Sequence, residues 1–232
     1  MYPAVIVGEI HGEIMQRKPV IEKRLKREKE RRSREILQAA KKVILDKNFS
    51  GATMDNIAAE AGITKPTIYQ YFSTKDELFV NMVEPLIESL ATKLELIRAD
   101  IQGGKYTSGR DIVRDVFNVY YGTFEQDPEL FRLFNIFLQV GVVHRMNPEA
   151  ASIITTWGKK CFDEGNMIVS MSVREGFFRD MKIQHTTDFV WGAFWGIVQV
   201  EQNKWGREGI SSYLKPVLEY AENLLVTALV IK

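Results

Sequence analysis

The sequence predicts an all-α fold. Apolar residues recur three and four positions apart through most of the 232 residues, as they do along the buried side of a helix. Clusters of Gly, Pro, Asn and Asp separate these periodic stretches and mark turns. The strict alternation of apolar and polar residues that indicates β-strands occurs nowhere along the chain. Helices joined by short loops are therefore expected throughout.

Composition excludes several classes of protein. The single cysteine, Cys161, rules out a disulfide framework and favours a reducing cytoplasm. No segment approaches the ~20 uninterrupted apolar residues of a transmembrane helix. The histidines His11, His144 and His185 are scattered, and neither a metal-ligand spacing nor a Gly-rich phosphate loop is present. We therefore expect that the protein is not an enzyme, that it binds no cofactor or metal, and that it does not contact a membrane.

Residues 1–21 are expected to form an N-terminal extension. The segment is too short for a signal peptide and lacks the basic start of one. Three interpretations stay open: a flexible arm, a partner-binding segment, or an overlong start with Met15 as the true initiator.

A first helix is expected over residues 22–47. Its first half holds acid-then-base pairs four residues apart, a spacing that stabilises helices. The pairs are Glu22 with Lys26, Glu28 with Arg32, and Glu30 with Arg34. Its second half has an apolar face of Ile36, Leu37, Ala40, Val43, Ile44 and Leu45. Asn48 is a suitable stop because asparagine tolerates left-handed backbone.

Charge is segregated along the chain. Residues 17–34 hold ten basic and three acidic residues, a net charge of +7, whereas the rest of the chain has a net charge of −6. Such a run is ordinarily a solvated helix face. A cluster of basic residues in a nearly neutral protein also suits a protein that binds a polyanion through one of its ends.

Two short helices joined by a tight turn are expected next. Thr53 is a suitable N-cap for a helix over residues 54–61, with Asp55 in its first turn, and Gly62 ends that helix. Thr64 caps the second helix, and Pro66 in its first turn costs little because the N–H there is unpaired anyway. Ile68 with Tyr71 or Phe72 would face inward.

The outward side chains of the second short helix are Lys65, Thr67, Tyr69 and Gln70. Lysine, glutamine and threonine hydrogen-bond base edges in the major groove, and aromatic surface contacts thymine methyl groups. A helix-turn-helix that binds DNA is therefore predicted. The alternative is a helical hairpin in an ordinary all-α protein, which the neighbouring basic run makes less attractive.

A helix over residues 75–98 follows. Thr74 and Glu77 have the spacing of a capping box. Lys75 is electrostatically out of place in a first helical turn, and it makes sense if the helix N-terminus and the lysine together hold a DNA phosphate.

Residues 32–79 resemble the DNA-binding domain of the tetracycline-repressor (TetR) family of bacterial transcription regulators. The resemblance covers about one fifth of the chain. It rests on the ordered set Ala39, Ala40, Phe49, Thr53, Ile57, Ala58, Ala61, Gly62, Tyr69, Phe72, Lys75, Leu78 and Phe79. Asp55 and Asn56 depart from it, because some relatives have basic residues there, so base contacts from that helix are in doubt.

The resemblance implies which residues contact DNA. Thr64, Lys65, Pro66, Thr67, Tyr69, Gln70 and Tyr71 match positions at the major groove or its phosphates. Thr53 at the start of the first short helix, Lys75 at the backbone, and Arg31 and Arg32 in the basic run complete the expected DNA-binding set. The helix-turn-helix domain is placed at residues 22–79 and a second domain at residues 80–232.

The second domain is expected to be one helical domain with a sizeable core. Helices are predicted over residues 111–126, 128–143, 148–175, 186–205 and 210–230. Residues 102–109 read as a loop, Pro128 and Pro148 begin helices, and residues 206–209 end one.

The middle helices of this domain are rich in aromatic residues. Most such side chains are simply core. The family resemblance implies a ligand among these helices, and apolar walls with few polar groups suit a hydrophobic or acyl-type effector. The candidate ligand-binding residues are Phe131, Phe134, Asn135, Trp157, Phe162, Trp191 and Trp195, with Gln139, Arg145 and Thr155 or Thr156 as further polar groups.

The last two helices offer a candidate dimer interface. Their apolar and small residues repeat at helical intervals, which ordinary packing within one protomer would also explain. The residues are Gly192, Gly196, Leu214, Val217, Leu218, Ala221, Leu224, Leu225 and Ala228. The resemblance implies a homodimer with a four-helix interface, and such a dimer would contact two half-sites of a palindrome.

These expectations combine into a homodimeric repressor that binds double-stranded operator DNA. A ligand in the second domain would shift the helix that begins at Lys75 and weaken DNA binding. The alternative is an architectural or partner-binding DNA protein that uses the same fold without a small-molecule effector.

Overall fold

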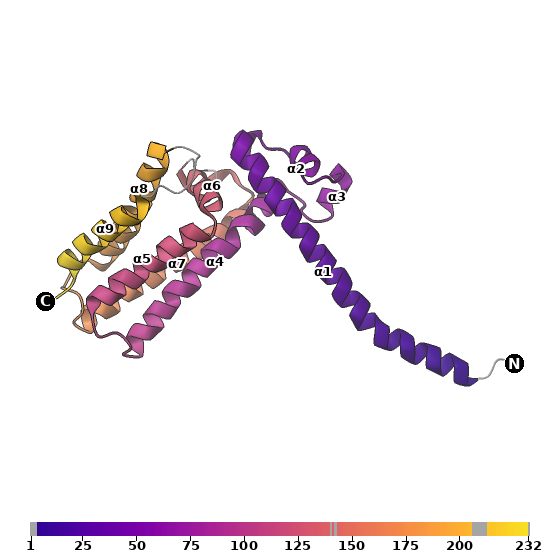
Figure 1. Cartoon of the computed structure of the whole chain (residues 1–232), viewed down its shortest axis with the longest axis horizontal. Helices are drawn as coiled ribbons and strands as arrows, with labels where there is room; N and C mark the ends of the chain where they lie inside the picture. Colours follow the sequence, from indigo (N-terminus) through magenta and orange to yellow (C-terminus); the bar gives the residue numbers. More distant parts are fainter. Residues whose placement is uncertain (1–3, 140, 142, 206–212, 232) are drawn as a thin grey trace. The chain divides into compact units, whose positions relative to one another are not determined.

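A computed structural model gives the fold and describes residues 4–139, 141, 143–205 and 213–231. The chain divides into two compact units, residues 1–82 and 83–232. The described residues are α-helical with short connections and contain no β-strand (Figure 1). The predicted all-α class is confirmed. No helix in the described ranges has both the length and the apolar character that a membrane span requires.

The first unit begins with α1 (Ala4–Gly51), which starts well before the predicted residue 22. Residues 4–21, expected as a separate extension, continue the backbone of this helix. Asn48 interrupts the helical geometry with φ 62° and ψ 165°, as a predicted stop should, and helical geometry resumes after it as far as Gly51. The positive φ explains why asparagine suits this position.

Three further helices form in the first unit. They are α2 (Met54–Glu60), α3 (Lys65–Tyr69) and the start of α4 (Lys75–Gln102). The core between them consists of fully buried side chains from every helix: Ile36, Ala40, Ile44, Ile57, Ala58, Ile68, Phe72, Leu78 and Phe79. The predicted apolar face of α1 is thus the one that packs, except that Leu37 and Leu45 are only half-buried.

The second unit contains the rest of α4 and five more α-helices. They are α5 (Gly109–Gln126), α6 (Pro128–Gln139), α7 (Pro148–Arg174), α8 (Ile183–Trp205) and α9 (Leu214–Leu229). A short 3₁₀ helix, η1 (Val143–Arg145), follows α6, which ends four residues before the predicted position. The predicted stop over residues 206–209 and the predicted start of the last helix at residue 210 lie outside the described residues.

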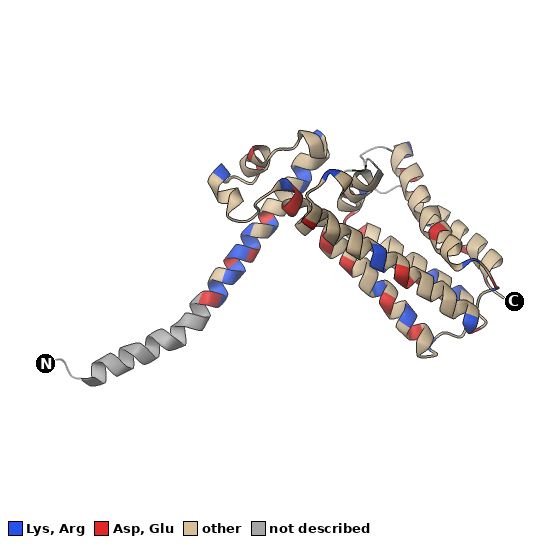
Figure 2. Ribbon diagram, turned by 180° about the vertical axis from the view of Figure 1, so that it is seen from behind, with Lys and Arg blue, Asp and Glu red and all other residues tan. Residues whose placement is uncertain are grey.

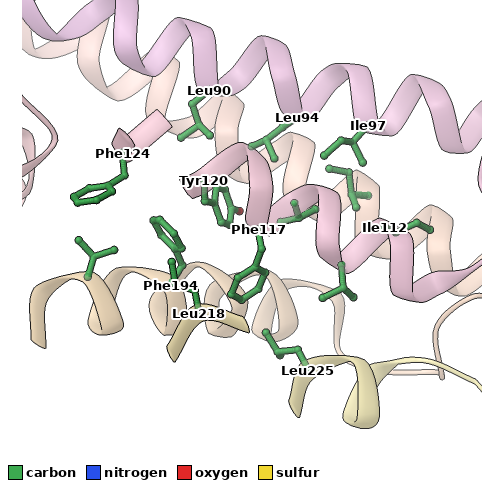
Figure 3. Close-up of a cluster of buried hydrophobic side chains, with 14 of the residues drawn as sticks. Leu90, Leu94, Ile97, Ile112, Phe117, Tyr120, Phe124, Phe194, Leu218 and Leu225 are labelled. Atoms are coloured by element: carbon green, nitrogen blue, oxygen red, sulfur yellow. The ribbon is translucent and has the colours of Figure 1, made fainter. Parts of the chain in front are cut away.

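The core of the second unit lies between α4, α5, α8 and α9 (Figure 3). Its centre is Phe194, which is fully buried and lies within 6.5 Å, ring centroid to centroid, of Phe117, Tyr120, Phe131 and Trp191. Gly165 lets α7 approach α8, because a Cβ there would lie 2.7 Å from Thr187 Cγ2. This aromatic cluster holds the helices that surround an internal cavity.

Candidate nucleic-acid interface and internal cavity

The turn between α2 and α3 is built from local hydrogen bonds. Thr53 caps α2 as predicted, because its Oγ1 accepts from the Asn56 N–H at 3.1 Å. Gly62 follows the helix with φ 65°, and the amides of Gly62 and Ile63 donate to Ala59 O and Ala58 O. This is the Schellman arrangement, in which a left-handed residue satisfies the last carbonyls of a helix. The chain therefore turns sharply into α3.

Helix α3 presents one side to solvent. Thr64 caps it, since its Oγ1 accepts from the Thr67 N–H at 3.4 Å, and the two threonine hydroxyls lie 2.8 Å apart. Ile68 is fully buried and anchors the opposite side. The candidate DNA-binding residues of this segment lie on the accessible side: Thr64, Lys65, Pro66, Tyr69 and Gln70 are exposed, and Thr67 and Tyr71 are half-buried. One surface thus gathers hydroxyl, ammonium, amide and aromatic groups.

Lys65, the strongest candidate for a base contact, is paired with Asp55. The Lys65 Nζ lies 2.8 Å from Asp55 Oδ1, and both side chains are mostly exposed. The hydrogen bond to Asp55, followed by its charge, raises the pKa of the Lys65 ammonium. A base contact by Lys65 therefore competes with this pair, which joins α2 to α3. Exposed pairs of this kind contribute little to stability and break readily.

Lys75 has a structural role that the sequence did not predict. Its Nζ donates to Phe49 O at 2.5 Å and to Ala52 O at 2.9 Å, and it lies 4.2 Å from the centroid of the Phe49 ring. Partial burial lowers the pKa of this ammonium. The expectation that a phosphate is needed to account for this lysine is wrong, because backbone carbonyls at the end of α1 already bind it. A phosphate contact through its remaining donor stays a prediction.

The start of α4 is capped largely as predicted. The Glu77 N–H donates to Thr74 Oγ1 at 3.0 Å, and the Glu77 carboxylate accepts from the Ser73 N–H at 2.7 Å. The reciprocal bond reaches the residue before the cap rather than the cap itself.

Residues 22–31 of α1 are all exposed, and Figure 2 shows blue Lys and Arg concentrated in this part of the helix. Arg31 pairs with Glu28 and Glu35, and Arg32 pairs with Glu35 at 3.0 Å. The charges of Glu28 and Glu35 and their hydrogen bonds raise the pKa of Arg31, with Glu28 the larger cause. These exposed pairs support the helix, and they leave most of its lysines free to face a polyanion.

The second unit encloses a cavity of about 320 Å³. Its wall is mainly apolar and comes from α4 to α8 and η1. The lining residues are Ile87, Leu90, Leu94, Tyr120, Phe134, Leu138, Gly141, Val143, His144, Ile154, Thr155, Gly158, Lys159, Cys161, Phe162, Thr187 and Trp191. Three candidate ligand-binding residues, Phe134, Phe162 and Trp191, lie in this wall, and so does Thr155.

The other candidate ligand-binding residues lie elsewhere. Phe131 and Trp195 pack on each other at 5.2 Å beside the lining rather than in it. Asn135 is 1% exposed and absent from the wall. Trp157 donates from Nε1 to Glu84 Oε1 at 3.1 Å. These four side chains do not line the cavity, because a helix turns each of them about 100° from its neighbour, and aromatic character alone does not reveal which one faces a void.

The residues of α4 that line the cavity were not predicted from the sequence. Ile87, Leu90 and Leu94 follow each other at helical spacing and are buried, and Tyr120 and Thr187 face them from α5 and α8. The periodicity of α4 was visible, although nothing in it separates a core face from a cavity wall.

The candidate dimer residues split into two sets. Leu214, Leu218 and Leu225 are buried in the core of the second unit, so they pack inside the protomer. The others face outward: Gly192, Gly196, Leu224 and Ala228 are exposed, and Val217 and Ala221 are half-buried. A Cβ at Gly192 or Gly196 would meet nothing within 4 Å, so neither glycine serves packing inside the protomer. Phe189 and Val200 on α8 and Tyr220 on α9 are also at least half exposed.

Comparison with known proteins places the N-terminal unit. Residues 36–82 match the profile of the family described as "Bacterial regulatory proteins, tetR family". This is the segment that forms the helix-turn-helix. Residues 36–82 are therefore a tetR-type DNA-binding segment.

Two curated relatives match this chain over 106 residues each. The HTH-type transcriptional activator FasR of Mycolicibacterium smegmatis is 32% identical across 45% of this chain and 46% of its own length. The nucleoid occlusion factor SlmA of Pectobacterium carotovorum is 30% identical across 45% of this chain and 51% of its own length. The chain thus spans about half of these relatives.

A solved structure shares its fold with most of the chain. The transcriptional regulator FadR of Bacillus subtilis, in complex with stearoyl-CoA, is 19% identical, with a TM-score of 0.58 over 83% of this chain and 96% of that one. At this identity the likeness establishes the fold alone.

The cavity wall offers few reactive groups. In the described ranges no three His, Cys, Asp or Glu residues are grouped as metal ligands. Burial raises the pKa of the Cys161 thiol to about 12, so it is protonated and a weak nucleophile.

Proposed function

We propose that this protein is a homodimeric transcriptional repressor of the tetR family that binds a palindromic operator and is released by an apolar small molecule. The observation that carries the proposal is the presence of two features in one chain. A helix-turn-helix exposes a polar recognition surface on α3, and a separate unit encloses an apolar cavity. Helix α4, which begins directly after the helix-turn-helix, supplies part of the cavity wall.

DNA binding rests on the chemistry of α3 and α1. Recognition helices contact base edges with side chains of the kinds found on α3, while lysines and arginines hold the phosphates. The exposed cations of residues 22–34 supply the second kind of contact. Because α3 has only five residues, one copy would contact few base pairs. Two copies related by a two-fold axis would contact two half-sites and gain specificity from both.

The outward faces of α8 and α9 support a homodimer. Leu224 is 54% exposed and Tyr220 is 66% exposed on α9, and Phe189 is 65% exposed on α8. Contiguous apolar surface of this kind commonly marks an association site. The exposed Gly192 and Gly196 would let a helix of a second copy approach closely. A two-fold pairing of these helices would form a four-helix bundle.

Effector release rests on the cavity and α4. The cavity volume lies at the low end of the range for small-molecule sites. The solved FadR structure holds an acyl compound, which supports an apolar or acyl-type ligand here. Pro85 lies inside α4 and removes one helical hydrogen bond between Lys75 and the lining residues Ile87 to Leu94. A ligand that prefers one bend of α4 would change the affinity for DNA.

Selection of bound sequences from a random duplex pool tests the proposal. The purified protein should enrich a palindrome, and the affinity for that duplex should fall steeply with salt because several phosphates are neutralised. Candidate apolar ligands are then titrated into the complex, and release is the expected result. Binding without an enriched site would overturn sequence-specific regulation, and unchanged operator affinity with every bound ligand would overturn effector release.

A second function is a DNA-bound protein that acts through a protein partner. The likeness to SlmA, named a nucleoid occlusion factor, favours it over part of the chain. The same selection separates the two functions. An effector that occupies the cavity and releases DNA supports the repressor, whereas a protein that binds DNA and accepts no small molecule supports the partner-binding function.

A further inference from the structure

The cavity has an outer and an inner half that differ in exposure. Leu138, His144, Thr155, Lys159 and Phe162 line it and are exposed, so they surround its mouth. The inner wall is formed by buried residues: Ile87, Leu90, Leu94, Tyr120, Val143, Ile154 and Thr187 are each less than 9% exposed. A ligand that carries a charge would keep it at the mouth, where water and Lys159 are available, because an isolated charge is costly to bury.

The inner half contains three polar side chains. The Cys161 Sγ donates to Ile87 O at 3.7 Å, and the Thr187 Oγ1 donates to Ile183 O at 3.2 Å. The Tyr120 hydroxyl is different. Tyr120 is 5% exposed and lines the cavity, and its hydroxyl makes no hydrogen bond within the residues that the structure describes. A phenolic hydroxyl in a cavity wall can donate one hydrogen bond to a ligand.

The position of the Tyr120 hydroxyl is fixed by packing. Its ring lies 5.0 Å from Trp191 and 5.3 Å from Phe194, centroid to centroid, and Figure 3 shows it between α4 and α8. Burial, and secondly the charge of a Cys161 thiolate, raise the pKa of the hydroxyl, so it stays protonated and able to donate. The group is thus held in place and lines the cavity as an unused donor.

We infer that Tyr120 forms an inner polar subsite that binds a hydroxyl or carbonyl oxygen at the buried end of an otherwise apolar effector. This inference rests on the proposed function, because it takes the cavity to be the effector site. The volume of about 320 Å³ matches roughly ten groups the size of a water molecule at ~30 Å³ each. The effector class is therefore an apolar chain or ring system of about ten carbons with a polar group at each end.

Two matched acids test the subsite. Decanoic acid and 10-hydroxydecanoic acid share the carboxylate that stays at the mouth, and they differ in the oxygen that would reach Tyr120. Their affinities are measured by calorimetry on the full chain and on Tyr120→Phe, which removes the hydroxyl alone. We expect the intact protein to prefer the hydroxy acid by ~3- to 10-fold, the worth of one neutral hydrogen bond. In Tyr120→Phe the preference should vanish.

Tyr121→Phe is the matched control, because Tyr121 loses the same hydroxyl and does not line the cavity. It should keep the preference for the hydroxy acid. Melting curves of both variants check that they fold. Equal affinities in the intact protein, a preference that survives in Tyr120→Phe, or binding of neither acid would each overturn the subsite.

Failure of the subsite can be told from failure of the proposed function because these titrations contain no DNA. A protein that binds its operator and is released by other ligands but ignores both acids disproves only the subsite. A Tyr120-dependent preference without any effect on operator binding disproves only the release mechanism.

Discussion

Lys75 shows how a residue can carry a role that its sequence position conceals. Its ammonium binds the carbonyls of Phe49 and Ala52 and thereby ties the start of α4 to the end of α1. We predict that Lys75→Ala lowers the free energy of unfolding by about 1–3 kcal/mol, because both carbonyls lose a charged donor. Urea denaturation without DNA measures this. If the variant is as stable as the unchanged protein, the two hydrogen bonds of Lys75 do not stabilise the fold, and contact with DNA is the role that remains for this lysine.

Asp55 is predicted to restrain the recognition lysine. Asp55→Asn should tighten binding to all duplexes, because it removes a negative charge from the surface and frees Lys65 from its partner. Lys65→Ala should instead reduce the preference for the selected site by roughly tenfold if the lysine contacts a base. Binding titrations on the selected duplex and on a scrambled duplex separate the two effects. An equal loss on both duplexes for Lys65→Ala would remove it from the base-reading set.

Cys161 provides a reporter for the cavity. Since burial raises the pKa of its thiol to about 12, alkylation near pH 8 should be slower than for a free cysteine by at least ~100-fold. The rate should rise with pH, because the thiolate is the reacting form. A ligand in the cavity should slow the reaction further. Reaction at the rate of a free thiol would show that the Cys161 thiol is not buried in the cavity wall.

At the scale of the element, the turn after α2 depends on one backbone conformation. Gly62 has φ 65°, and a side chain there is strained even though no neighbouring atom lies within 4 Å of the Cβ position. Gly62→Ala should cost about 1 kcal/mol of unfolding free energy. Gly51→Ala is the control, because Gly51 lies at the end of α1 without such a φ, and an added Cβ would make only an ordinary contact with Lys47. Similar losses in both variants would contradict a conformational cause.

The short helices were predictable because the interactions that begin and end them are made by residues close together in the sequence. The caps at Thr53, Thr64 and Thr74 and the stop at Gly62 are each specified within four residues, and each forms as predicted. The partners of Lys75 are not local, since Phe49 lies twenty-six residues away. A cavity is still harder to predict from the sequence. It is the space that remains where the side chains of five helices do not fill the interior, and no sequence pattern marks it.

At the scale of the whole molecule, α9 shows why an interface is difficult to predict from periodicity. This helix carries leucines on its buried and its exposed side, so the repeat of leucines alone does not separate a core face from an outer face. The structure separates them: Leu225 is 5% exposed and Leu224 is 54% exposed. Adjacent leucines thus belong to different surfaces, and this makes them a matched pair for testing association.

Leu224→Glu should dissociate the proposed homodimer and leave each protomer folded. A carboxylate on the outward face of α9 would lose hydration in an interface, whereas it stays in water on a monomer. Leu225→Ala should affect stability rather than association. It should lower the free energy of unfolding by about 2–5 kcal/mol, because it leaves a cavity in the core. Light scattering gives the mass, and circular dichroism gives the helix content. With Leu224→Glu, operator affinity should fall because a monomer contacts one half-site. A protein that stays dimeric with this change would place the interface on another surface.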